Sequence, residues 1–141
     1  MNMNIEVRYV SRSGNTKKVA DAIAEAVGVE AKDCSEPLTT PIDLLFLGGS
    51  VYGGGVDKVL KQFIDQLSPE KVKCVAAFGT SAIKKEPDRE TEKLVHNKGI
   101  PVSSQSFHCR GEFSVVHKGH PDNDDLKQAA SFALAAVKAM N

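Results

Sequence analysis

The segment Asp43–Gly49 (D-L-L-F-L-G-G) is a continuous apolar run that ends in glycine. Strands without polar alternation are typical of parallel sheets whose two faces are both covered by helices. A second run of this kind lies at Val72–Phe78, so the sequence predicts two buried central strands. Because few architectures cover both faces of a sheet, these runs constrain the fold more than any other feature.

Strands and helices alternate along the rest of the chain. The predicted strands are Ile5–Val10, Val29–Lys32, Asp43–Gly49, Val72–Phe78 and Val102–Phe107, the last continuing through Cys109. The predicted helices lie at Val19–Val27, Val59–Leu67 and Pro87–Asn97 and after the Pro121–Asp125 cluster, where Asp122 is a suitable cap. We expect Cys34–Ile42 to be a loop, which abbreviates one crossover. Five alternations predict a doubly wound α/β domain with a parallel sheet.

The composition narrows the classes of function. A chain of 141 residues is long enough for one domain with a real core, and we expect a single domain over residues 1–141. Eighteen basic and eighteen acidic residues give no electrostatic case for a nucleic acid or an anionic membrane as partner. We recognise neither a membrane-spanning run nor a signal peptide. The three widely spaced cysteines favour a reducing, cytoplasmic location.

The stretch Ser11–Thr16 (S-R-S-G-N-T) joins the first predicted strand to the first predicted helix. The unpaired N–H groups of a first helical turn, together with the helix dipole, attract anions. The hydroxyl and amide side chains here are suitable phosphate donors, and Gly14 lets the backbone approach a ligand closely. The same residue types are preferred helix caps, so the six residues alone fit either a phosphate site or a well-capped helix.

Two further stretches of small residues, Ser50–Gly55 and Gly79–Ser81, follow the two buried strands, and we expect both to be loops. In doubly wound sheets, ligands bind beyond the carboxyl ends of the strands, where the strand order switches. All three small-residue stretches fall at that edge. The sequence therefore predicts one binding site that is assembled from the three of them.

Taken in order, the motifs resemble the flavodoxin family over nearly the whole chain. They are S-R-S-G-N-T at 11–16, G-G-S-V-Y-G-G-G at 48–55, F-G-T-S at 78–81, F-H-C-R-G-E-F at 107–113 and G-H-P-D-N-D-D-L at 119–126. The resemblance implies a doubly wound three-layer sandwich with a five-stranded parallel sheet in the order 2-1-3-4-5. It also implies flavin mononucleotide (FMN) as the cofactor.

The resemblance assigns cofactor-binding roles residue by residue. The phosphate would be held by Ser11, Arg12, Ser13, Gly14, Asn15 and Thr16. The isoalloxazine ring would be flanked, mostly by backbone, by Ser50, Val51, Tyr52, Gly53, Gly54, Gly79, Thr80 and Ser81. Because the chain has no tryptophan, Tyr52 is the aromatic residue placed to stack on the ring. The alternative interpretation of Tyr52 is an exposed residue at a loop tip.

We interpret the chain as an FMN-binding protein that carries electrons between redox partners, without catalytic residues of its own. The balanced charge departs from the acidic surface usual in carrier flavodoxins. The alternative is therefore a small FMN-dependent reductase or oxidase acting on a quinone, a porphyrin-like compound or another organic substrate. A binding module that has lost flavin is a third class, against which the intact first motif argues. The partner and the oligomeric state are left open.

Three other groups of residues have simpler interpretations than a functional site. His117 and His120, followed by Asp122 and Asp124, have a spacing compatible with a metal site, but such a cluster is typical of a solvated cap, and we predict no metal. Cys109 is interpreted as a packing residue, with His108 pointing to the opposite face of the sheet. The charged residues Lys84, Lys85, Asp88, Arg89 and Glu90 are interpreted as an ordinary solvated helix face.

Overall fold

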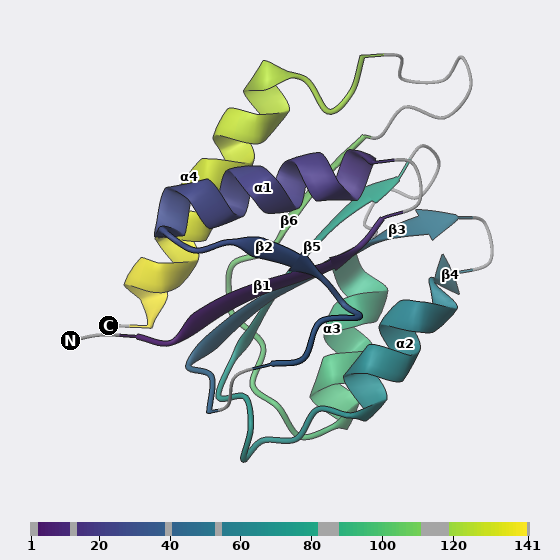
Figure 1. The fold of residues 1–141 in the computed structure, drawn as a ribbon, viewed down its shortest axis with the longest axis vertical. Coiled ribbons are helices and arrows are strands. Elements are labelled where there is room, and N and C mark those ends of the chain that lie inside the picture. The colour runs from purple at the N-terminus through teal and green to yellow at the C-terminus, as the bar shows by residue number, and fades with distance from the viewer. Residues whose placement is uncertain are drawn as a thin grey trace.

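The computed structural model describes residues 3–11, 14–38, 41–52, 55–81, 88–110 and 119–140. Strands and helices alternate along this part of the chain, as the sequence predicts (Figure 1). In chain order the elements are β1 (Ile5–Val10), α1 (Asn15–Val27), β2 (Ala31–Asp33), β3 (Leu44–Tyr52), β4 (Gly55–Val56), α2 (Lys58–Asp65), β5 (Val75–Ser81), α3 (Asp88–Asn97), β6 (Phe107–Arg110) and α4 (Asn123–Ala139). No helix of these residues is both long and apolar enough to span a membrane.

The main sheet has the strand order β2-β1-β3-β5-β6, and every neighbouring pair in it is parallel. These five strands correspond to the five predicted ones, so the expected order 2-1-3-4-5 is confirmed. The apolar run that ends in Gly49 forms most of the central strand β3, which pairs with β1 from Ile5↔Leu44 to Val10↔Gly49. Both of its faces are buried, as a run without polar alternation requires.

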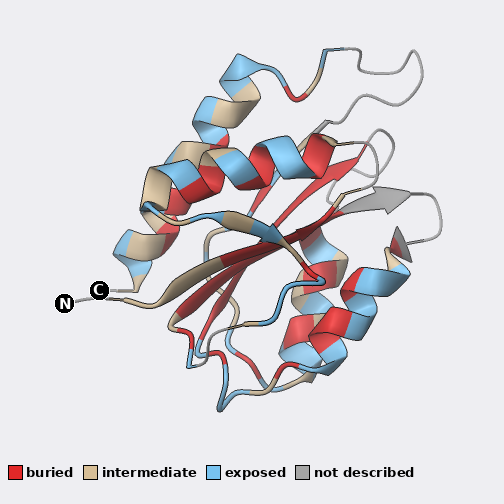
Figure 2. Cartoon of the chain, viewed as in Figure 1, coloured by how far each residue is buried: buried red, intermediate tan, exposed pale blue. Residues whose placement is uncertain are grey.

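Helices cover the two faces of the sheet in pairs (Figure 1). On one face, Phe46 and Phe78 pack with α1 and α4, and the ring of Phe132 meets that of Phe46 edge to face at 5.6 Å. On the other face, Leu45 and Leu47 pack with α2 and α3. Figure 2 shows the buried residues concentrated in the strands and along the inner sides of the helices. The result is the predicted doubly wound, three-layer arrangement.

The strands extend further toward their carboxyl ends than predicted. The expectation of a loop at Ser50–Tyr52 is wrong, because β3 continues to Tyr52, and the loop expected at Gly79–Ser81 belongs to β5. Pairing of the two strands continues through Ser50↔Thr80, which keeps the backbone groups of both stretches in the ladder. The short antiparallel strand β4 was not predicted.

The starts of three strands also differ from the prediction by two residues or more. Strand β2 begins at Ala31, β5 at Val75 and β6 at Phe107, and the upstream Val72 and Val102 make only isolated bridges. The reason for the shift in β2 and β6 is that they are edge strands, which present a weak apolar pattern. Local pattern alone therefore places the element but not its first residue.

The abbreviated crossover between β2 and β3 is confirmed, since the described residues from 34 to 42 contain no helix. In its place the side chain of Arg8, which is 1% exposed, reaches this segment from β1. The guanidinium donates to the carbonyl oxygens of Glu36 at 3.2 Å and Pro37 at 2.6 Å. It also pairs with the Glu6 carboxylate at 2.8 Å. A single buried side chain thus holds the loop against the sheet.

Candidate functional site

The N-terminus of α1 has a glycine at its cap position. Its N-cap is Gly14, with a φ of 91° that favours glycine and with no side chain to accept from the first turn. A Cβ built on Gly14 would meet nothing within 4 Å. The Ser11 hydroxyl accepts a hydrogen bond from the Gly14 N–H at 3.1 Å, which shapes the turn itself. Arg12 and Ser13 lie outside the described residues. A side-chain-capped start, the alternative that the sequence left open, is not observed at Gly14.

The other two helix starts with described caps are closed by side chains. Asp57 caps α2 by accepting from the Val59 N–H at 2.8 Å. Asp122 caps α4 by accepting from the Asp125 N–H at 2.9 Å, and the Asp125 carboxylate accepts in return from the Asp122 N–H. Such caps satisfy N–H groups that would otherwise remain available to a ligand. The start of α1 therefore differs in kind from those of α2 and α4.

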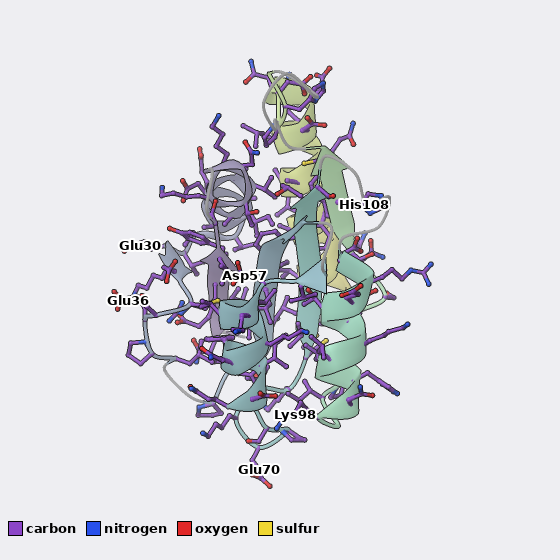
Figure 3. The ribbon with its side chains drawn as sticks, turned by 90° about the vertical axis from the view of Figure 1, so that its right-hand side faces the viewer. Glu30, Glu36, Asp57, Glu70, Lys98 and His108 are labelled. Atoms are coloured by element: carbon purple, nitrogen blue, oxygen red, sulfur yellow. The ribbon has the colours of Figure 1, made fainter. Side chains whose placement is uncertain are left out.

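Two threonine hydroxyls join the first and third predicted motifs. The Oγ1 atoms of Thr16 in α1 and Thr80 in β5 lie 2.8 Å apart, and both residues are buried. Thr80 is in turn the register partner of Ser50 in β3. The three stretches that were predicted to form one site therefore meet at the carboxyl edge of the sheet, the side that faces the viewer in Figure 3.

The other described residues that were predicted to bind the ring lie at the same edge. Backbone pairing places Val51 and Tyr52 at the end of β3, opposite Val56 and Gly55 of β4. Ser81 ends β5 and is buried, one residue after Thr80. The side chains of Ser50–Tyr52 and the residues Gly53 and Gly54 lie outside the described part, so stacking by Tyr52 stays a prediction. Gly79 pairs with Gly49 within the sheet.

A carboxylate and an imidazole that sequence reasoning missed lie one strand further along this edge. The Nδ1 atom of His108 in β6 is 3.0 Å from Oδ1 of Asp88, in the first turn of α3. The Asp88 side chain is 4% exposed, and the His108 side chain is 45% exposed. The interpretation of Asp88 as part of a solvated helix face is therefore wrong. Helical periodicity could not show this, because it is β6 that brings His108 to the residue.

The described thiols are unsuited to nucleophilic chemistry. Burial raises the pKa of the Cys109 thiol to about 12, and burial raises that of Cys34 to about 12 as well. Cys109 packs against the core formed with α1 and α4, whereas its neighbour His108 reaches α3 on the other face. The expected opposite orientation of the two side chains is confirmed, and Cys109 serves packing.

A cluster of ligand-type side chains lies at the start of α4. It contains His120, Asp122 and Asp125, and not Asp124 as the spacing suggested; His117 lies outside the described residues. His120 Nδ1 is 2.7 Å from Asp125 Oδ2, and this hydrogen bond raises the pKa of His120. The same Oδ2 atom of Asp125 also accepts a hydrogen bond from the Asp122 N–H. The cluster is thus built as an extended helix cap.

The profile of the flavodoxin domain family matches residues 7–130, and the chain belongs to this family. A solved archaeal flavodoxin superposes with a TM-score of 0.81 and 19% identity, over 99% of this chain and 100% of the other.

Two curated relatives are similar over most of the chain. An uncharacterised protein of Methanocaldococcus jannaschii is 26% identical over 137 residues, covering 88% of this chain and 91% of its own. The flavodoxin-like domain-containing protein BilS of Clostridioides difficile is 29% identical over 140 residues, covering 86% and 78% respectively. The family rests on the sequence match, and the likeness of the solved structure supports the fold.

Proposed function

We propose that this chain is an FMN-binding flavodoxin-like protein that carries electrons between redox partners. The observation that carries the proposal is the glycine cap of α1, where Gly14 leaves the N-cap position without a side chain and with open space around it. An open helix N-terminus between a strand and a helix suits a phosphate dianion. Membership of the flavodoxin family supports a flavin nucleotide over other phosphorylated ligands.

The residues at the carboxyl edge fit the parts of this cofactor. The first turn of α1 would hold the phosphate, and Ser11, Arg12, Ser13, Asn15 and Thr16 would surround it. The ends of β3 and β5 would flank the ring, with Tyr52 as the stacking residue. Bound FMN supplies the electron-transfer chemistry, while the chain binds it, orients it and excludes water from it.

Comparison of FMN with riboflavin tests the proposal directly. Riboflavin lacks the phosphate, so we expect it to bind at least about a hundredfold more weakly, because a charge-assisted phosphate contact to several donors is worth about 3 kcal/mol or more. Isothermal calorimetry on the flavin-free protein gives both dissociation constants. Equal constants would contradict the assignment of the α1 start, and absence of FMN binding would contradict the proposed function as a whole.

The His108–Asp88 pair favours a second candidate function, a small FMN-dependent reductase or oxidase of a quinone, a porphyrin-like compound or another organic substrate. The Asp88 carboxylate, 3.0 Å from His108 Nδ1, places a carboxylate and an imidazole together at this edge, the side-chain types that serve as general acids and bases. Turnover of a quinone with reduced nicotinamide by the FMN-loaded protein, lowered at least tenfold in the His108→Ala variant, would establish the enzyme. Rapid reduction of a partner protein without quinone turnover would favour the carrier.

The three described cysteines form no disulfide. These free thiols support a cytoplasmic location. The proposed redox function, in turn, implies redox partner proteins or a small organic substrate as partners. Separation of cell fractions with an antibody to the chain tests the location.

A further inference from the structure

The hairpin of β3 and β4 leaves one backbone donor pointing away from its own ladder. Its two register pairs are Tyr52↔Gly55 and Val51↔Val56, and two residues of sequence separate Tyr52 from Gly55. In a hairpin of this length the pair beside the turn exchanges hydrogen bonds, and the next pair does not. The Val56 N–H therefore faces outward from β3 and needs another acceptor.

Glu90 in the first turn of α3 supplies that acceptor. Its Oε2 atom accepts a hydrogen bond from the Val56 N–H at 3.2 Å in a partly buried position, across 34 residues of sequence. Helix α3 contacts both β4 and β5. A hydrogen bond to an ionised acceptor is stronger than one between neutral groups. One carboxylate thus connects the strand after β3 to the helix after β5.

The turn that presents Glu90 is itself firmly placed. Asp88 is buried and faces His108 of β6, Thr91 is 1% exposed, and Val95 lies fully in the core. The burial of these three residues leaves α3 little freedom to shift relative to the sheet. Glu90 therefore projects from a helix whose position relative to the sheet is fixed.

The hairpin has little else to hold it. Two register pairs make a marginal strand pairing on their own, and β4 has only two residues. The Val56 side chain is 6% exposed and packs in the core with α2 and α3, which anchors the strand at one point. The Glu90 hydrogen bond adds a second point and fixes the direction of the backbone.

We propose that Glu90 is a positioning residue for the ring-side wall of the flavin site, a role that rests on the proposed function. It acts through Val56, by holding the end of β3 and the strand β4 at the carboxyl edge. Glu90 belongs to α3, which packs on the face of the sheet opposite to α1, and it contacts β4 beside the end of β3. Its contribution therefore concerns the isoalloxazine ring and is independent of the phosphate.

The test compares Glu90→Ala, Glu90→Gln and the control Glu70→Ala. Glu70 is exposed and lies at the bottom of the view in Figure 3, well away from His108. Fluorescence quenching gives the dissociation constants of FMN and riboflavin for each protein. The amide resonances of the flavin-free proteins, recorded by NMR, report on the Val56 N–H directly.

We expect Glu90→Ala to weaken FMN and riboflavin by the same factor, about fivefold to tenfold, so that their ratio is unchanged. Glu90→Gln keeps an amide oxygen as acceptor and should remain within about twofold of the parent, as should Glu70→Ala. The Val56 amide resonance should move upfield in Glu90→Ala and stay near its parent position in the control.

Two results would overturn the inference while leaving FMN binding intact. The first is an unchanged FMN affinity in Glu90→Ala, provided that the parent binds FMN. The second is a loss confined to FMN, which would place Glu90 on the phosphate side. If Glu90→Ala does not fold, Glu90→Asp, which is one methylene shorter, takes its place with the same expectations.

Discussion

Helices α1 and α4 cover the same face of the sheet, yet their starts are built in opposite ways (Figure 1). At α4, Asp122 and Asp125 exchange hydrogen bonds as a capping box, and His120 adds a further contact to Asp125. At α1, the cap residue is Gly14, which has no side chain to accept from the first turn. Both helices follow a strand of the parallel sheet, so topology does not explain the difference.

The difference separates a structural helix start from a functional one. Orphan N–H groups that are satisfied within the chain contribute to stability at all times. Orphan N–H groups that are left open contribute only when a ligand supplies the acceptor. We expect changes at the cap position of α1 to alter flavin affinity and changes at the cap of α4 to alter the stability of the fold.

The largest effect is expected for Gly14→Asp. A carboxylate about 4 Å from the phosphate would repel it by about 4 kcal/mol at an effective dielectric constant of about 20, which lowers the FMN affinity roughly a thousandfold. Flavin fluorescence quenching measures the loss. Gly28→Asp is the matched control, because Gly28 has the same left-handed backbone and equally open surroundings at the other end of α1. An equal loss of affinity in both variants would contradict the phosphate assignment.

The second prediction concerns the link between α1 and β5. Thr80→Val removes one of two buried hydroxyls that lie 2.8 Å apart, and we expect the free energy of unfolding to fall by about 1 kcal/mol. Urea denaturation of Thr16→Val, Thr80→Val and the double variant forms a double-mutant cycle. If the two single effects simply add, the hydroxyls do not support each other and the start of α1 is held by other contacts.

At α4, Asp122→Ala should lower Tm by about 2–6 °C, because it removes the acceptor for the Asp125 N–H. Its FMN affinity should equal that of the parent. Asp124→Ala removes the same charge from the same turn without removing the cap residue, and should shift Tm less. Thermal unfolding followed by circular dichroism measures all three proteins. A change in FMN affinity in Asp122→Ala would remove the distinction between the two helix starts.

The smallest effect is a pH dependence at α4. The hydrogen bond to Asp125 raises the pKa of His120 above its ordinary value of 6.5. The stability that this pair contributes is therefore fully present below pH 6.5 and is lost as the pH rises through the folded-state pKa. The Tm advantage of the parent over His120→Gln should shrink between pH 6 and pH 9.

Local sequence was sufficient to predict a structural feature wherever that feature depends on one short segment of the chain. The unbroken apolar runs predicted the central strands, and Asp122 predicted the α4 cap, because both depend on neighbours in sequence. The extension of β3 and β5 through Ser50↔Thr80 depends on pairing between segments 30 residues apart, which small-residue composition conceals. The contact of Asp88 with His108 depends on the placement of β6, so no pattern within α3 could have indicated it.

Arg8 shows what replaces a secondary-structure element when the chain omits it. A crossover helix would satisfy its own carbonyl groups; here one guanidinium serves the carbonyl groups of Glu36 and Pro37 instead. This role requires several donors in a fixed planar arrangement, so lysine is not an equivalent residue at position 8. Position 8 and the length of the segment from 34 to 42 are therefore expected to change together among related chains. A helix inserted there would make the arginine unnecessary, and loss of the arginine would leave the short connection without its anchor.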